Sequence, residues 1–429
     1  MSLAYFWIFI FLLAASMPVV FALLVGPGLS LALDGEQVFY KTLLSRLYNG
    51  MDSFPLMALP FFILAGQVMN SGGITRSIVD FSQAMIGHVR GGLAQVNIGS
   101  SLLFAGLSGS AVADASALGK IFIPAMNQNG YSRPFAAAIT AASSVIGPII
   151  PPSGIMILYA FIMNVSVAGL FAAGLVPGLM IAVGLMGMTS YLARKRGYPV
   201  ANQRVSWHQR GVALRRTLPA LLTPVILLGG ILGGVFTPTE AAAVAAVYAI
   251  LVSVFYLRTL RLRSLFQIFV SSVAQSGIVL MLVGASVAFA WIITVSGLAH
   301  TVVDGMASIS NNILVLLFLL NIFLLLIGMF LDAGPAVLVL GPVLGPMFIS
   351  LGIDPLHFAV VMCVNVTVGL ATPPMGLVLF VSSAVSRERV ETIAVQMLPF
   401  LLVEVLVIFL ITYFPVLSLA LPRWLGFAS

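Results

Sequence analysis

Long apolar stretches cover most of the chain, and short polar or basic segments separate them. A stretch of about 20 apolar residues is long enough to cross the hydrocarbon core of a bilayer as a helix. The pattern therefore predicts an all-α polytopic membrane protein. The stretches that we expect to form continuous membrane helices cover residues 3–30, 52–70, 167–193, 217–236, 237–257, 274–296 and 392–420.

Two further apolar spans, 133–163 and 355–385, each contain a Pro-Pro pair near the middle, at 151–152 and 373–374. A proline removes a backbone N–H donor, its ring clashes with the preceding helical turn, and it pushes the residue before it out of the helical region. We therefore expect both helices to unwind at mid-membrane. The freed carbonyl groups cannot face lipid, so they must line a cavity or bind a ligand. Paired broken helices are typical of the ion and substrate site of a secondary transporter.

Two other apolar segments, 92–128 and 313–350, are interrupted by small and polar residues. The first interruption is the Gly- and Ser-rich stretch 106–114, and the second is Asp332-Ala333-Gly334-Pro335. Such segments predict re-entrant helical hairpins with polar tips, which are allowed only where protein or a watery cavity surrounds them.

The hairpin and the broken helix occur twice. An offset of 222 positions brings Gly147 onto Gly369 and Gly154 onto Gly376. The additional helix 217–236 inverts the second copy, which predicts an inverted repeat. The expected units are scaffold and interfacial helices in 1–91, the first hairpin and broken helix in 92–163, connecting and scaffold helices in 164–312, the second hairpin and broken helix in 313–385, and a C-terminal helix in 386–429.

Charge supports the membrane assignment and predicts an orientation. Only 7% of the 429 residues are charged, whereas a soluble domain carries about 25%. The net charge of +7 comes largely from short basic loops such as 194–216, 258–263 and 387–389. Because Lys and Arg are enriched in cytoplasmic loops, these loops are expected in the cytoplasm, with a cytoplasmic N-terminus and a periplasmic C-terminus. No nucleic-acid partner is expected.

Cysteine and histidine usage argues against a transition-metal site. The single Cys363 excludes an internal disulfide and a multi-cysteine site. The four histidines are far apart in the sequence and show no metal-ligand spacing. We expect no cofactor.

Five motifs spread over nearly the whole chain carry a family resemblance. They are PFFILAG at 60–66, GLSGSAVAD at 106–114, GPIIPPS at 147–153, FTPTEAAA at 236–243 and GLATPPMG at 369–376. With them the chain resembles the large membrane subunit (DctM-like) of tripartite ATP-independent periplasmic (TRAP) transporters.

The resemblance implies sodium-driven import of a small organic anion across a bacterial inner membrane by an elevator movement. C4-dicarboxylates, sialic acids, related sugar acids and 2-oxo acids are all compatible substrates. The implied partners are a small DctQ-like membrane subunit of about four helices, a periplasmic DctP-like binding protein that delivers the substrate, and membrane lipid.

The resemblance also implies two sodium sites, each where a hairpin tip meets a broken helix. Sodium ions can be bound by the carbonyl oxygens of unwound helices without a formal charge. Carried onto this sequence, the first site comprises Ala105, Ser108, Gly147, Ile150 and Pro152. The second comprises Gly328, Gly369, Thr372 and Met375. Sodium is then the coupling ion and the only expected metal.

Polar residues near the breaks are candidates for substrate binding. Half-helix N-termini favour anions, and hydroxyl and amide groups can add hydrogen bonds. The candidates are Ser110, Ser143, Ser144, Ser153, Asn365 and Thr367. For any one of Ser110, Ser143 and Ser144, helix packing is an equally good interpretation.

We expect local structural roles for three acidic residues. Asp114 and Asp332 are expected to cap helices or to form local hydrogen bonds at the hairpin tips. A charged residue at membrane depth is nevertheless a functional candidate by default. Glu240 is expected to stabilise the start of a helix that Thr237 or Thr239 caps.

Two other functions stay open. A passive channel or uniporter would use the same membrane helices, although it would not need two matched breaks. An intramembrane serine protease would use Ser108, which lies in a GxSG motif. Its base would have to be His300 or His357, neither of which lies in a recognisable partner motif. The protease interpretation leaves the repeat unexplained, so we expect a transporter and not an enzyme.

Overall fold

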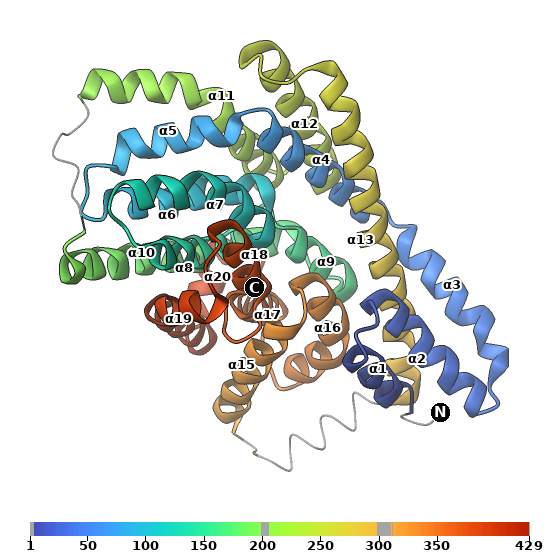
Figure 1. Ribbon diagram of the computed structural model, residues 1–429. Coiled ribbons are helices and arrows are strands. Elements are labelled where there is room, and N and C mark those ends of the chain that lie inside the picture. The colour runs from blue at the N-terminus through green and yellow to red at the C-terminus, as the bar shows by residue number, and fades with distance from the viewer. Residues whose placement is uncertain (1–3, 199–205, 298–309, 311, 429) are drawn as a thin grey trace.

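The computed structural model describes residues 4–198, 206–297, 310 and 312–428. Within these ranges every regular element is helical (Figure 1). Eight of the described helices are long and apolar enough to cross a membrane. These findings confirm the predicted all-α polytopic membrane protein.

The first hairpin and broken helix form as the sequence predicts. They consist of α6 (Gly92–Ser108), α7 (Ala111–Gln128), α8 (Arg133–Ser144) and α9 (Gly154–Met163). The turn between α6 and α7 needs a residue with positive φ, and Gly109 supplies it at +59°. Ser110 then caps α7 by accepting a hydrogen bond from the Ala113 backbone N–H.

The second copy has the same order of elements. It consists of α15 (Ile313–Phe330), α16 (Ala333–Ser350), α17 (Pro355–Gly369) and α18 (Leu377–Ser386). Asp332 caps α16 through its carboxylate, 2.8 Å from the Ala333 nitrogen. The predicted capping role of Asp332 is therefore confirmed.

The two copies pack into one unit because the hairpin of each copy contacts the broken helix of the other. The returning arm of each hairpin lies against the second half of the other broken helix, so that α7 contacts α18 and α16 contacts α9. α19 (Val390–Tyr413) packs on α8, and α10 (Val167–Arg196) packs on α17. We call α6–α10 and α15–α19, with the terminal α20 (Val416–Trp424), the hairpin body.

A second group of helices, the scaffold helices, flanks the hairpin body along one side in Figure 1. Its members pack in pairs, α4 with α12, α5 with α11, and α3 with α13. They are α3 (Tyr40–Met51), α4 (Ala58–Ser71), α5 (Ile74–Ile86), α11 (Trp207–Leu232), α12 (Pro238–Leu251) and the 35-residue α13 (Leu262–Ser296). Short 3₁₀ turns, Gln37–Phe39 and Phe54–Met57, precede α3 and α4, and the π-helical segment Val252–Tyr256 follows α12.

The start of α12 confirms the predicted cap. Thr237 accepts a hydrogen bond from the Glu240 backbone N–H, and the Glu240 carboxylate accepts one from the Thr237 backbone N–H at 2.8 Å. This reciprocal arrangement is a capping box. Glu240 therefore stabilises a helix start, as expected.

The single helix predicted over 3–30 is wrong. The described part of this segment forms two helices that pack together, α1 (Ala4–Ala14) and α2 (Val19–Leu33). Pro18 disfavours a helical Met17, and Ser16 has a φ of 62°. The predicted cytoplasmic N-terminus requires this segment to cross the membrane once, which two helices do only if together they make a single crossing.

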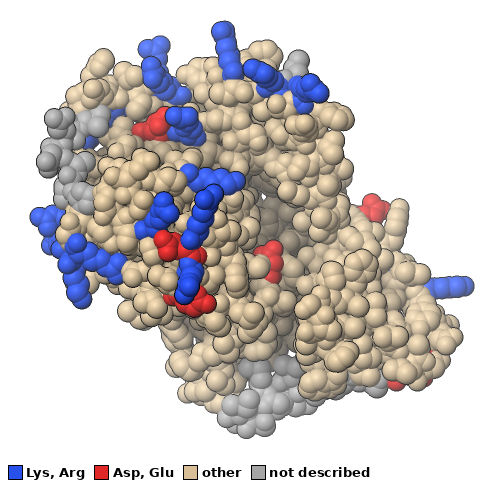
Figure 2. Space-filling model, in the orientation of Figure 1, with Lys and Arg blue, Asp and Glu red and all other residues tan. Residues whose placement is uncertain are grey.

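Basic side chains are distributed unevenly over the surface. Figure 2 shows Lys and Arg gathered toward one end of the visible face, over the region of α5, α11 and the end of α10. The last turn of α10 alone contains Arg194, Lys195 and Arg196. The same view shows a hollow near the middle of this face.

Candidate functional site

A cavity of about 200 Å³ lies where the hairpin body meets the scaffold helices. Both hairpin tips, both helix breaks, α4 and α13 contribute to its wall. The wall includes Ser108, Gly109, Ser110, Ala111, Pro148, Pro152, Gly154, Asp332, Gly334 and Leu370 from the hairpin body, and Leu59, Phe62, Ile63 and Val279 from the scaffold. Elements that lie more than 200 positions apart in the sequence thus form one site.

The two predicted breaks are present. Helical structure stops at Ser144 and resumes at Gly154 in the first repeat. It stops at Gly369 and resumes at Leu377 in the second. Both Pro-Pro peptide bonds are cis.

The first break exposes backbone carbonyls to the hairpin tip. In the described chain, no backbone hydrogen bond engages the carbonyls of Gly147, Ile150 or Pro152. A Cβ on Gly109 at the tip would lie 3.1 Å from the Pro152 oxygen. The structure therefore brings the Pro152 carbonyl, one of these predicted ligands of the first sodium site, to the hairpin tip. The carbonyl of Ala105, a fourth, accepts a 3.4 Å hydrogen bond from the Gly109 N–H.

Asp114 lies at the same place. Its side chain is fully buried, and the Ser108 hydroxyl donates a hydrogen bond to its Oδ1 atom. Its Oδ2 atom has no hydrogen-bond partner among the described residues. A Cβ built on Gly147 would collide with that Oδ2 atom, so the carboxylate lies against the first break. The expected local hydrogen bond is present, and Ser110 rather than Asp114 caps α7.

The position of Asp114 adds an oxygen that we did not assign to a ligand set from the sequence. The available signal was a charge at membrane depth, which is a functional candidate by default. That signal does not show which break the carboxylate faces, because the side chain reaches Gly147 across 33 residues of sequence.

The second break touches its own hairpin through two glycines. A Cβ on Gly369 would lie 2.6 Å from the Cα of Gly328, so only hydrogen atoms fit between these backbones. The Thr372 hydroxyl donates a hydrogen bond of 2.9 Å to the Val368 carbonyl, which leaves its oxygen lone pairs available. The carbonyls of Gly369 and Thr372 each accept one backbone hydrogen bond, and each retains a second lone pair. Met375, the fourth predicted ligand residue, is half-exposed.

The substrate candidates fall into two groups. Ser110 lines the cavity. Ser153 is buried and caps α9, where it accepts a hydrogen bond from the Met156 N–H and donates one of 2.5 Å to the Pro148 carbonyl. Four candidates are buried inside the hairpin body and are not among the residues that line this cavity, namely Ser143, Ser144, Asn365 and Thr367.

The four buried candidates already have protein partners. The Ser143 hydroxyl accepts a hydrogen bond from Ser101, and the Ser144 hydroxyl donates one to the Ala141 carbonyl. The Asn365 amide donates to Asn321 on α15, and the Thr367 hydroxyl donates to the Cys363 carbonyl. These contacts are those of packing residues in this conformation, except that the Asn365 Oδ1 atom has no hydrogen-bond partner among the described residues. Their role in substrate binding stays a prediction.

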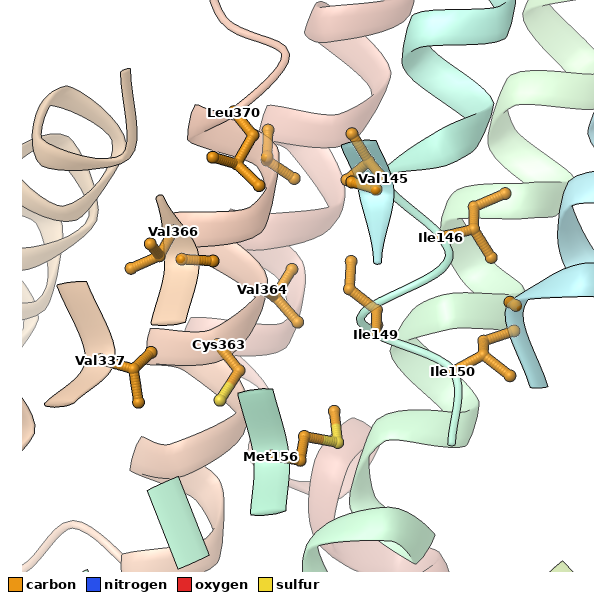
Figure 3. Close-up of a cluster of buried hydrophobic side chains, with 14 of the residues drawn as sticks. Val145, Ile146, Ile149, Ile150, Met156, Val337, Cys363, Val364, Val366 and Leu370 are labelled. Carbon is orange, nitrogen blue, oxygen red and sulfur yellow. The ribbon is translucent and has the colours of Figure 1, made fainter. Parts of the chain in front are cut away.

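An apolar layer separates the two breaks. Figure 3 shows Val145 and Ile149 of the first break on the side toward Val364 of the second broken helix, and Ile146 and Ile150 on the opposite side of the break. The Ile150 side chain lies against Gly178 of α10. Most of these side chains are fully buried, and the exposed fraction of Ile150 is 7%. The polar groups of each break are therefore directed to their own hairpin and to the cavity.

Ser108 has no catalytic partner in the described part of the chain. Its hydroxyl is bonded to Asp114. The ring of His357 is buried on α17, where it contacts the Ser418 hydroxyl and the Thr412 carbonyl. His300 lies outside the described residues. Among the described residues, no three or more His, Cys, Asp or Glu side chains come together in a group that could hold a metal ion.

Paired hairpins, paired broken helices and a cavity at their meeting point define a membrane transporter. The family model described as "Tripartite ATP-independent periplasmic transporter, DctM component" matches residues 6–417. The chain belongs to this family, as its motifs indicated, and it is therefore a transporter and not an enzyme.

Curated relatives agree over nearly the whole chain. The sialic acid TRAP transporter large permease protein SiaM of Vibrio cholerae is 39% identical over 419 residues, covering 97% of this chain and 98% of the relative. The C4-dicarboxylate TRAP transporter large permease protein DctM of Pseudomonas aeruginosa is 38% identical and covers 90% of each chain. The uncharacterized protein YgiK of Salmonella typhimurium is 40% identical, covering 96% of this chain and 95% of the relative.

Solved structures support the fold. The YdaH transporter of Alcanivorax borkumensis aligns with a TM-score of 0.61 over 92% of this chain and 89% of its own, at 18% identity. MtrF of Neisseria gonorrhoeae aligns with a TM-score of 0.60 over 89% of this chain and 84% of its own, at 14% identity. At these identities the likeness concerns the fold alone.

Proposed function

We propose that this chain is the membrane-spanning transport subunit of a sodium-coupled importer of a small organic anion. A periplasmic binding protein delivers the substrate, and a small membrane subunit completes the complex in a bacterial inner membrane. Sodium is the coupling ion, and no other cofactor takes part. The observation that carries the proposal is the meeting of each hairpin with its own helix break, at Asp114–Gly147 and at Gly328–Gly369.

The oxygen atoms at these two meetings suit sodium. The first site has free carbonyls at Gly147, Ile150 and Pro152 and the unpartnered Oδ2 atom of Asp114. The second has carbonyls with a free lone pair and the hydroxyl of Thr372. A buried carboxylate oxygen without a partner is costly, and a bound sodium ion would neutralise it. Asp114 therefore joins the proposed first site.

The cavity wall suits a small anion bound by dipoles rather than by a salt bridge. The wall residues include the hydroxyls of Ser108 and Ser110 and the N-terminal end of α9 near Gly154, where the helix dipole favours negative charge. No lysine or arginine is among them. Sialic acid, C4-dicarboxylate and 2,3-diketo-L-gulonate appear in the names of the relatives, and we propose a substrate of this organic-acid class.

The scaffold wall supports an elevator movement. Leu59, Phe62 and Ile63 of α4 and Val279 of α13 present apolar side chains to the cavity. An apolar surface forms no specific hydrogen bonds that would have to break when the hairpin body slides past it. We propose that the hairpin body moves and that the scaffold helices stay in place.

Orientation follows the basic surface. The basic ends of α10 and α11 face the cytoplasm by the positive-inside rule, and the C-terminus is proposed to be periplasmic. The N-terminus is cytoplasmic if α1 and α2 together cross the membrane once.

Uptake into proteoliposomes tests the function. The vesicles contain this chain and its small partner subunit, and labelled organic acids are supplied with the cognate binding protein. We expect uptake that requires both the binding protein and an inward sodium gradient. Flux that ignores the gradient and only equilibrates the substrate would favour a channel or uniporter and would refute the two sodium sites.

A further inference from the structure

A second buried carboxyl group lies away from the cavity, in the interior of the hairpin body. The residues that α19 buries recur at spacings of four and three, which makes one continuous stripe along the helix. The stripe consists of Ile393, Met397, Phe400, Glu404, Val407 and Ile411, and the buried residues Ile408 and Thr412 lie beside its C-terminal end. Glu404 occupies the middle of this otherwise apolar stripe, its exposed fraction is 0%, and it does not line the cavity described above.

Both carboxyl oxygens of Glu404 lack a hydrogen-bond partner among the described residues. This distinguishes Glu404 from Asp114, whose Oδ1 atom accepts a hydrogen bond from Ser108. The neighbours of Glu404 on its own helix are apolar. Phe400 contacts the ring of Phe135 on α8, and Val403 lies where a Cβ on Gly184 of α10 would collide with it.

The charged and titratable groups on the helices around α19 lie toward its two ends. Arg196 of α10 reaches Gln396, and His357 of α17 reaches the Thr412 carbonyl. Gln396 and Thr412 are each eight residues from Glu404, or about 12 Å along a helix that rises 1.5 Å per residue.

The remaining groups on these helices are few. Arg133 begins α8, Tyr191, Arg194 and Lys195 lie in the last two turns of α10, and Arg423 lies near the end of α20. The thiol of Cys363 on α17 is uncharged in its ordinary form, and α15 and α18 contain no titratable side chain. No ion pair with Glu404 is formed in the described part of the chain.

An ionised carboxylate in such a place would lose its hydration without gaining a counter-charge, and buried groups of this kind are neutralised instead. We propose that Glu404 is a proton-binding site and that its proton is a structural component of the hairpin body. Glu404 lies on the buried face of α19, and α19 packs on α8, α10 and α17 of the same body, so the site lies inside the body and not at the surface that faces the scaffold. The proton therefore travels with the body and does not exchange during the transport cycle.

Infrared spectroscopy of the full-length chain in lipid bilayers tests the proton directly. A solvated glutamate is ionised at pH 7, since its ordinary pKa is about 4.3. We expect the C=O stretch of a protonated carboxyl at pH 7, and we expect the component that Glu404 contributes to be lost in Glu404→Gln. Glu391→Gln is the matched control, because Glu391 is exposed in the first turn of the same helix. The band should survive in that control.

Because Asp114 is also buried, the readout is the difference between the wild-type and Glu404→Gln spectra. A difference spectrum without a protonated-carboxyl band would overturn the proposal. This measurement needs neither substrate nor sodium, so its outcome is independent of the proposed transport function. Substrate uptake by Glu404→Gln then tests whether the proton is structural and stays bound during the transport cycle. Glu404→Gln imitates the protonated form and should retain wild-type uptake within about twofold. A folded Glu404→Gln variant without uptake would show that the proton has to leave during the cycle, and would overturn the structural role.

Discussion

Gly328 of the second hairpin and Gly369 of the second broken helix are in direct backbone contact. A Cβ on Gly369 would lie 2.6 Å from the Cα of Gly328 and 3.0 Å from the Leu325 oxygen. Neither atom belongs to a flexible side chain, so the hairpin arm must move away to accommodate any larger residue. The contact holds together two residues whose carbonyls are proposed to bind the same sodium ion.

Gly369→Ala is therefore expected to weaken sodium binding. The added methyl group pushes the two backbones apart, and the carbonyl oxygens of the second site move apart with them. We expect the sodium concentration for half-maximal uptake to rise at least about tenfold, which corresponds to about 1.4 kcal/mol. Gly187→Ala in α10 is the control, because a Cβ there would meet nothing within 4 Å. Equal sodium dependence in both variants would contradict the proposed second site.

Asp114→Asn tests the carboxylate at the first site. The amide keeps the size of the side chain and can still accept the Ser108 hydrogen bond, but it lacks the negative charge. If Oδ2 binds sodium, uptake should need about tenfold more sodium, a loss typical of a charge-assisted contact. Asp80→Asn removes a charge from the exposed side of α5 and should leave the sodium dependence unchanged. A wild-type sodium response in Asp114→Asn would exclude Asp114 from the site.

Thr372→Ala removes a hydroxyl from the second site. The hydroxyl donates its hydrogen to the Val368 carbonyl, so the lone pairs of the hydroxyl oxygen remain available to a sodium ion. We expect a moderate rise in the sodium requirement, of about threefold to tenfold for one neutral ligand. Thr372→Ser retains the oxygen and should restore the wild-type value. If alanine and serine behave alike, the hydroxyl is not a ligand and the site consists of carbonyls.

Ser108→Trp tests the tip of the first hairpin. Ser108 lines the cavity of about 200 Å³, and an indole ring would fill much of that volume. We expect uptake to be lost while the protein still elutes as a folded, monodisperse species. Ser108→Ala, which adds no volume, should be expressed equally well and should retain measurable uptake. A fully active Trp variant would show that the tip does not form a tight site.

Local sequence signals predicted the elements that build the site. The Pro-Pro pairs act on the backbone of their own helix, and both breaks appear within the predicted spans. The Gly- and Ser-rich tip similarly produces a turn, because Gly109 can adopt a positive φ and Ser110 can cap the next helix. The helix breaks and the hairpin turn each depend on a few residues that are neighbours in the chain. They can therefore be predicted from the sequence alone.

Contacts between distant segments could not be predicted in the same way. The apolar wall at Phe62 and Val279 has no sequence signal beyond hydrophobicity, which every membrane helix shares. The same holds for Asp114. A charged residue at membrane depth indicates function, but the sequence does not show which group its carboxylate contacts. At the N-terminus, the hydropathy of 3–30 predicts one helix, whereas α1 ends at Ala14 and Pro18 directly precedes α2.

Orientation in the membrane can be measured because Cys363 is buried and is the only cysteine. Single cysteines placed at exposed positions should then label from one side of the membrane without background. Trp207 and Trp424 are each 81% exposed, and we expect Trp207→Cys to label only from the cytoplasm and Trp424→Cys only from the periplasm. Labelling of both from the same side would refute the proposed orientation. Ser2→Cys shows on which side of the membrane the N-terminus lies. Cytoplasmic labelling requires α1 and α2 together to cross the membrane once. Periplasmic labelling shows that they return to the side on which they began.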